Sequence, residues 1–163
     1  MVSAEDYLAT VRERLLEDGC EVTDETIGSL RAIVGYRSNV KALSKMHLFT
    51  AVASVPEVDQ ATMGDFARQV SDYAKRQKGQ ARGAQSGVVA LAALVAPKVD
   101  SAAKQLADRP FRLGMGGFAA MVQPAAVDLT EGRVHTFRGR RLWGAALAGY
   151  LRDKSARYLP DPA

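Results

Sequence analysis

Apolar residues recur at helical spacing in several segments of the chain. Leu8, Val11 and Leu15 share one face of a helix predicted over about residues 4–18, with Ser3 as its N-cap. Gly19 follows at the position where helices often end on a glycine. The N-terminal segment is therefore predicted to be an amphipathic helix.

The middle of the chain carries the clearest helical pattern. Met63, Phe66 and Val70 begin an apolar stripe, and either Asp59 or Thr62 can cap the helix that carries it. A short helix over residues 101–108 and a closing helix from Leu142 to about Tyr158 follow the same periodicity. The closing helix is predicted from six apolar positions: Leu142, Trp143, Ala146, Leu147, Tyr150 and Leu151.

Strand-type patterns occupy most of the remaining chain. Alternation or continuous apolar runs predict strands over residues 20–26, 30–37, 46–55, 88–96 and 118–128, and a last one around residues 134–137. The run 88–96 has no polar position, which is typical of a strand buried on both faces.

Pro124 predicts a bulge in the strand 118–128. Residues 39–45 are interpreted as a polar connection, and residues 79–87 and 109–117 as glycine-rich loops.

The order α-β-β-β-α-β-α-β-β-α indicates an α+β fold in which helices pack on a mixed sheet. A single domain is expected over residues 1–158, because 163 residues suit one hydrophobic core and no linker interrupts the pattern. Residues 159–163, LPDPA, are expected to be a frayed tail, since two prolines prevent the helix from continuing.

Hydropathy and cysteine content indicate the cellular compartment in which the protein is expected. No apolar run reaches the ~18 residues of a membrane span, and the acidic N-terminal segment lacks the apolar centre of a signal peptide. The single cysteine, Cys20, is interpreted as a small buried residue in a reducing compartment. These features predict a cytoplasmic protein that does not contact membranes.

Two patterns suggest enzyme chemistry weakly. The run Gly114–Ala119 matches the G-x-G-x-x-A fingerprint of dinucleotide-binding proteins, but the residues after it have strand character, whereas that motif must open a helix. His47 and His135 lack further ligands at recognisable zinc spacing, so packing or surface roles are favoured over a catalytic pair. No metal or cofactor is predicted.

Basic residues recur in three loops: around residues 37–45, at the exit of the middle helix, and before the closing helix. If these loops meet at one end of the sheet, they form a surface that binds phosphate groups. Solvated surface charge is the favoured interpretation because the net charge is only +4. The candidate phosphate-binding residues are Arg76, Lys78, Arg82, Arg138, Arg140 and Arg141.

The segments GYRSN, KMHLFTAVASVPEV and VDLTEGRVHTFRGRRLWGAALAGYL resemble a group of small uncharacterised actinobacterial proteins. Some members of that group carry the label levansucrase. Levansucrases are five-bladed propellers with three catalytic carboxylates, whereas this chain has about six strand candidates and two long helices. The resemblance therefore implies kinship without an activity or catalytic residues.

The leading order α-β-β-β-α-β is also similar to the core of restriction-endonuclease-like nucleases. Those enzymes hold magnesium with an acid on the second strand and an acid-x-Lys pair on the third. The corresponding residues here, 30–37 and 46–53, include no acid. If the fold is of that type, its metal site has been lost.

These observations favour a non-enzymatic, cytoplasmic protein-binding or assembly domain. A homodimer is expected, with Trp143 and Tyr150 at its interface, because the aromatic residues of the closing helix exceed what a small core covers. The alternatives are a nucleic-acid-associated protein that uses the basic loops, and a hydrolase that uses the two histidines with carboxylates.

Overall fold

The computed structural model describes residues 1–41, 44–78, 86–109, 111–115, 118–137 and 145–162. Within them, four helices and seven strands form one α+β domain, which confirms the predicted fold class and element order and adds one short strand. The elements are α1 (Ala4–Glu17), β1 (Glu21–Ile27), β2 (Leu30–Lys41), β3 (Ser44–Ser54), α2 (Gln60–Lys78), β4 (Ser86–Ala96), α3 (Ser101–Ala107), β5 (Phe111–Met115), β6 (Phe118–Asp128), β7 (Arg133–Thr136) and α4 (Ala145–Tyr158).

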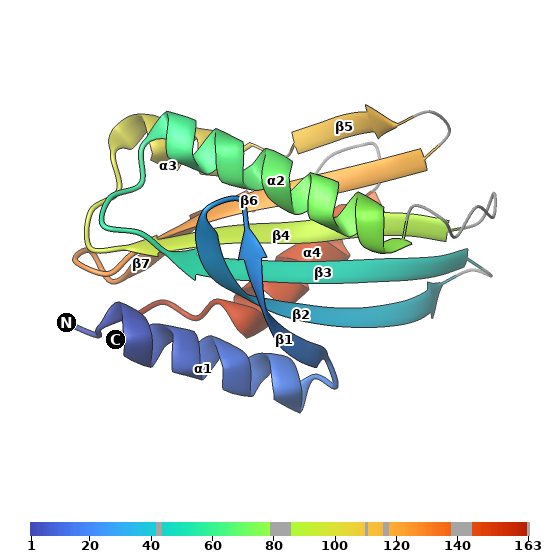
Figure 1. The fold of residues 1–163 in the computed structure, drawn as a ribbon, viewed down its shortest axis with the longest axis horizontal. Coiled ribbons are helices and arrows are strands. Elements are labelled where there is room, and N and C mark those ends of the chain that lie inside the picture. Colours follow the sequence, from blue (N-terminus) through green and yellow to red (C-terminus); the bar gives the residue numbers. More distant parts are fainter. Residues whose placement is uncertain (42–43, 79–85, 110, 116–117, 138–144, 163) are drawn as a thin grey trace.

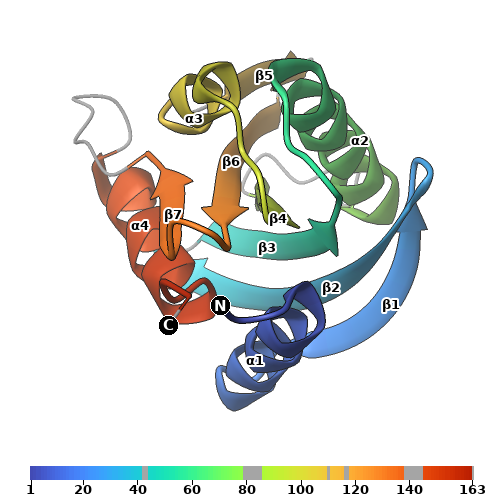
Figure 2. The same ribbon diagram turned by 90° about the vertical axis from the view of Figure 1, so that its left-hand side faces the viewer.

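The strands form one mixed sheet in the order β1-β2-β3-β4-β6, and β5 and β7 both pair with the outer edge of β6. β1, β2 and β3 are antiparallel, whereas β3, β4 and β6 run parallel. Helices α2 and α3 cover one face of the sheet, and α1 and α4 cover the other (Figures 1 and 2). The fold is therefore three layers deep, with two hydrophobic cores.

β4 is the strand that both cores share. Its residues from Val88 to Ala96 are at most 6% exposed, as expected for a parallel strand covered on both faces. Alternation sends Ala90, Ala92 and Leu94 toward α2 and α3, and sends the intervening side chains toward α1 and α4. Its small alanine side chains allow the helices to pack close to the sheet.

Helix α1 has the predicted boundaries. The backbone N–H of Asp6 donates to Ser3 Oγ at 3.1 Å, so Ser3 is the N-cap. At the other end Gly19 has φ +80°, and the N–H of Cys20 donates back to the carbonyl of Leu15 at 3.0 Å. This is the hydrogen-bond pattern of a Schellman motif, for which glycine is the favoured residue. It turns the chain directly into β1.

Aspartates cap α2 and α3, the two helices on the face of the sheet opposite α1. Of the two residues considered for α2, Asp59 forms the cap, with its Oδ1 accepting the N–H of Thr62 at 2.7 Å. Asp100 caps α3 in the same way through the N–H of Ala103, also at 2.7 Å. Both caps satisfy a backbone donor that the first turn of a helix leaves without a partner.

Two segments interpreted as loops are instead strands. The hairpin of β2 and β3 extends until Lys41 pairs with Ser44, through most of the predicted polar connection. β5 occupies the predicted glycine-rich loop 109–117 and pairs antiparallel with β6. In both cases a neighbouring strand supplies hydrogen bonds that the local polar or glycine-rich pattern does not reveal.

The bulge predicted at Pro124 is wrong. Residues 88–96 of β4 pair with residues 120–128 of β6 one to one, without an inserted residue. The pairing on the other edge of β6 explains why the proline is tolerated.

On that outer edge, the first residue of β5, Phe111, lies opposite Val122, and the last residue of β7, Thr136, lies opposite Ala125. Pro124 therefore lies in a gap between two partner strands. A proline lacks a backbone donor, and on this side no ladder bond is lost. The buried side chain of Gln123 lies at the same gap, where its amide donates to the Pro124 carbonyl at 3.0 Å and to Thr136 Oγ1 at 3.2 Å.

The prediction of a frayed C-terminal tail is also wrong, because residues 159–162 pack against the domain. Leu159 is only 3% exposed. The hydroxyl of Tyr7 donates to the Pro160 carbonyl at 2.8 Å, and the N–H of Val134 donates to Asp161 Oδ1 at 2.9 Å. Prolines end the helix, but they do not prevent an extended segment from joining α1 to β7. The domain thus includes residues 159–162.

The closeness of α1 to the sheet provides a stability test with an internal control. A Cβ at Gly35 in β2 would lie 2.7 Å from Cδ2 of the buried Leu15. Gly35→Ala should therefore overpack the core and destabilise the protein by about 1–3 kcal/mol. In helix α2 a Cβ at Gly64 would have its closest neighbour, Leu106 Cδ2, at 3.9 Å, so Gly64→Ala should stabilise by about 0.5–1 kcal/mol. Urea denaturation of both variants measures whether each substitution lowers or raises the free energy of unfolding. Equal changes of this free energy in the two variants would contradict this packing.

Candidate functional site

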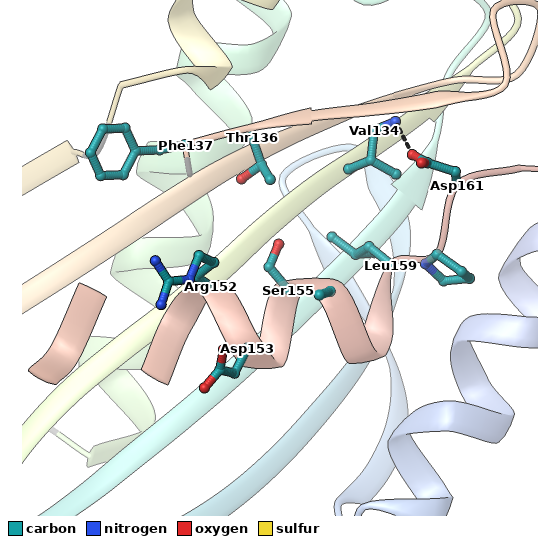
Figure 3. Close-up of a pocket in the computed structure, with 10 residues that line it drawn as sticks. Val134, Thr136, Phe137, Arg152, Asp153, Ser155, Leu159 and Asp161 are labelled. Atoms are coloured by element: carbon teal, nitrogen blue, oxygen red, sulfur yellow. Dashed lines mark hydrogen bonds between the residues drawn. The ribbon is translucent and has the colours of Figure 1, made fainter. Parts of the chain in front are cut away.

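A cavity of about 410 Å³ lies between β7 and the C-terminal half of α4 (Figure 3). Strand residues form one wall, the helix forms the other, and the packed tail closes one end. Val134 and Leu159 provide buried apolar surface, and Phe137 and Pro160 extend it. An apolar cavity with a few converging polar groups is the usual form of a small-molecule site.

Ser155 is the unusual residue in this cavity. It lies in phase with Leu151 and Tyr158 on the buried face of α4 and is 3% exposed. Its Oγ is buried and has no hydrogen-bond partner among the described residues. Figure 3 shows the hydroxyl directed from α4 toward β7, where Thr136 lies. A buried polar group without a partner costs about 1–3 kcal/mol, so its retention calls for an explanation.

Thr136, on the facing strand, has its hydrogen bonds satisfied. Its hydroxyl donates to the Pro124 carbonyl at 3.1 Å and accepts the amide of Gln123 at 3.2 Å. Thr136 is therefore a fixed part of the wall, whereas Ser155 retains its full hydrogen-bonding capacity.

The described charged residues that line this cavity are one arginine, Arg152, and two aspartates, Asp153 and Asp161. Arg152 is exposed, makes no ion pair with another described residue, and holds its guanidinium on the side of α4 that faces Phe137 (Figure 3). The carboxylate of Asp153 points away from Thr136, and that of Asp161 accepts the N–H of Val134. Arg152 is thus the charged group best placed to meet an occupant.

A buried ionic cluster positions α4 against the rest of the chain. The carboxylate of Asp18, 6% exposed, lies 2.6 Å from Lys154 Nζ, 2.7 Å from Arg37 Nη1 and 2.9 Å from Arg157 Nη1. The hydroxyl of Tyr158 also donates to it. Burial raises the pKa of Asp18, but the hydrogen bonds from Lys154, Tyr158 and Arg37 outweigh that effect and hold the pKa well below its usual range.

Asp18 could have been noticed in the sequence, because a carboxylate at a helix C-terminus faces the negative end of the helix dipole. Such a residue needs compensating cations. The neighbouring Cys20 is buried, with its Sγ 3.5 Å from the hydroxyl of Tyr158, and burial raises the pKa of its thiol. Its interpretation as a small buried residue is confirmed.

The predicted phosphate-binding residues fall mostly outside the described residues: Arg82, Arg138, Arg140 and Arg141. Arg76 is exposed near the end of α2, and Lys78 is the last residue of that helix. Lys45 pairs with Ser86, so the start of β3 and the start of β4 lie at one end of the sheet, the end that α2 reaches (Figure 1). Two of the three basic loops are therefore anchored at the same end.

The expected aromatic interface is only partly described. Trp143 lies outside the described residues. Tyr150 is 8% exposed and Tyr158 is fully buried, so the chain itself covers these two rings, contrary to the expectation of surplus aromatic surface. Among the described side chains, the large hydrophobic ones that are exposed are Met1 and Leu16. Homodimer formation stays a prediction.

The two histidines lie far apart on the sheet. His47 is in β3 and His135 in β7, with β4 and β6 between them, which separates them by at least about 14 Å. His47 Nδ1 lies 2.7 Å from the hydroxyl of Tyr36, and His135 Nε2 lies 3.3 Å from a carboxylate oxygen of Glu131. This arrangement does not bring them together as a catalytic pair.

The glycine-rich motif connects two strands. β5 and β6 pair antiparallel with Met115 opposite Phe118, so a strand follows the glycines. A dinucleotide-binding motif needs a helix N-terminus directly after its glycines, where this chain has a strand.

Over the described residues, no group of three or more His, Cys, Asp or Glu side chains converges as a metal site, and none of the helices is long and apolar enough to cross a bilayer. No protein-family model matches this chain, and no curated protein matches it at significant similarity. The resemblance to actinobacterial proteins stays a prediction.

The ionic cluster around Asp18 predicts a pH-dependent stability. Asp18→Asn should cost about 3 kcal/mol at pH 7, because it leaves the partly buried cations of Arg37 and Lys154, and the exposed one of Arg157, without their carboxylate. The lowered pKa of Asp18 stabilises the folded state above the pKa of the unfolded chain, about 4, and this contribution is lost as the pH falls further. Denaturation at pH 7 and pH 3 should therefore show a smaller difference between variant and parent at pH 3.

Asp24→Asn is the matched control, since the ion pair of Asp24 with Arg12 is exposed and contributes about 0–1 kcal/mol. A cost for Asp18→Asn that is as small as that of the control, or that is independent of pH, would contradict the role of Asp18.

Proposed function

We propose that this chain is a binding domain whose ligand is a small acidic molecule held between β7 and α4. The observation that carries the proposal is the buried, unpartnered hydroxyl of Ser155 in a cavity of about 410 Å³. The proposal narrows the sequence-based expectation of a non-enzymatic binding domain to one site and one class of ligand.

Recognition uses three kinds of surface. Arg152 pairs with a carboxylate or phosphate, for which a guanidinium is well suited because it donates two parallel hydrogen bonds. Ser155 donates to or accepts from a polar atom of the ligand. The buried side chains of Val134 and Leu159 cover the ligand's apolar part.

The composition of the cavity favours binding over catalysis. Its described lining residues include neither histidine nor cysteine, and Thr136 is already hydrogen-bonded to the backbone. A serine nucleophile needs an adjacent general base, and Ser155 has no hydrogen-bonded partner of that kind among the described residues. Ser155 is therefore proposed as a recognition residue.

A titration with benzoate and phenyl phosphate, followed by ligand-observed NMR, tests the class of ligand, with benzamidine as a cation of similar shape. Both acids should bind more tightly than benzamidine, and Arg152→Gln should weaken their binding about tenfold or more. Arg68→Gln is the control, because Arg68 is an exposed arginine of α2 that pairs with Asp65. No binding of either acid at millimolar concentration, or equal binding of benzamidine, would remove the proposal.

Ser155→Ala separates recognition from folding. The variant should weaken binding of the acids severalfold and leave the unfolding free energy unchanged or higher, because it removes a buried hydroxyl without a partner. A loss of about 1 kcal/mol or more on urea denaturation would instead assign Ser155 a structural hydrogen bond.

A second candidate function is nucleic-acid binding, which the anchoring of two basic loops at one end of the sheet favours. On this proposal, DNA or RNA affinity falls steeply with salt, because each neutralised phosphate releases counterions. About four phosphate contacts give a log–log slope near −3 to −4 on duplex DNA.

Replacing Arg76 and Lys78, at the end of α2, by alanine should make that slope shallower by about one to two and weaken binding to every sequence alike. Fluorescence anisotropy at several salt concentrations measures both effects. Binding that ignores salt and the double substitution, or no binding at micromolar protein, would rule this function out.

A further inference from the structure

A second cavity, of about 230 Å³, lies on the opposite face of the sheet beside the free edge strand β1. β1, β2 and β3 form its floor, and the last turns of α2 form its side. Alternation along β1 places Glu21, Thr23 and Glu25 on this face, the same face on which Ile27 joins the core under α2.

Three aromatic rings meet at this cavity. The ring of Phe49 is almost fully buried, with its centroid 4.9 Å from that of Tyr36 and 5.9 Å from that of Tyr73. The planes of Phe49 and Tyr73 are 88° apart, so these rings meet as the two sides of a corner. The faces of aromatic rings carry partial negative charge, which attracts cations.

The ring of Tyr36 is held in place from behind. It stacks on His47 with centroids 5.9 Å apart and an interplanar angle of 15°. The hydroxyl of Tyr36 also lies 2.7 Å from His47 Nδ1. These two contacts fix the orientation of the ring before any ligand arrives, which lowers the entropic cost of binding.

Carboxylates complete the cavity. Glu21 and Glu25 line it, and none of its described lining residues is basic. Burial and the charge and hydrogen bond of the neighbouring Glu25 carboxylate raise the pKa of Tyr73, and Arg76 on the adjacent turn of α2 lowers that pKa. The lining thus combines aromatic faces with an excess of negative charge.

We propose that this cavity binds a quaternary or methylated ammonium group. Such a cation is weakly hydrated and apolar in shape, so it gains from the aromatic faces and loses little by leaving water. An unmethylated ammonium is more strongly hydrated and is the weaker ligand. A divalent metal ion requires several converging carboxylates, whereas Glu21 and Glu25 are four residues apart on one strand, about 13 Å along it.

Choline and its neutral isostere 3,3-dimethylbutanol test the charge requirement by calorimetric titration of the whole chain. Choline should bind about two- to thirtyfold more tightly, since cation–π attraction contributes about 0.5–2 kcal/mol. Equal binding of the two would overturn the proposal in favour of a merely apolar cavity, and no choline binding at millimolar concentration would overturn it outright. N-acetyl-trimethyllysine methylamide, titrated in parallel, distinguishes a free small molecule from a methylated side chain as the preferred source of the group.

Three substitutions locate the site. Tyr73→Leu and Glu25→Gln should each weaken choline binding about threefold or more, whereas Tyr73→Phe keeps the ring and should bind as the parent does. Asp24→Asn is the control, because Asp24 lies on the other face of β1 and pairs with Arg12. If Tyr73→Leu unfolds the chain, choline binding by Tyr73→Phe and Glu25→Gln still tests whether this cavity is the site. Unchanged binding in Glu25→Gln, or equal loss in Asp24→Asn, would overturn the assignment.

Discussion

The carboxylate of Asp18 joins parts of the chain that are distant in sequence. It ends α1, and it accepts hydrogen bonds from Arg37 in β2 and from Lys154 and Tyr158 in α4. A buried carboxylate surrounded by cations is stable only when all partners are in place, because each isolated charge is costly to bury. The cluster therefore sets the position of α4, and with it the distance between α4 and β7.

That distance creates the cavity of Ser155. The tail reinforces it, because Asp161 accepts the N–H of Val134 and Pro160 accepts the hydroxyl of Tyr7. A rigid frame around an unsatisfied hydroxyl is a favourable arrangement for binding, since the ligand does not have to order its own site. The aromatic cavity beside β1 follows the same principle, with His47 as the fixed support of Tyr36.

Local patterns predicted most of the fold and little of either site. Continuous apolar residues identified β4, and helical periodicity with a cap identified α1 and α2. Ser155 and Glu25 carry no such signal, because a serine in a helix and a glutamate in an edge strand are ordinary on a solvated surface. Whether these two residues belong to a site depends on which residues the strand order places beside them. The pattern of a single sequence does not reveal that order.

The sequence by itself determined the α+β class, the order of the predicted elements and the burial of the central strand, since these depend on contacts between residues close in the chain. Only the tertiary structure decided that residues 159–162 are packed, that β5 forms in a glycine-rich segment, and that Pro124 lies in a gap between β5 and β7. Each of these depends on hydrogen bonds or burial provided by a partner outside the local segment. Pairing between distant segments overrides local propensity, because a backbone group without a partner costs more than an unfavourable residue type.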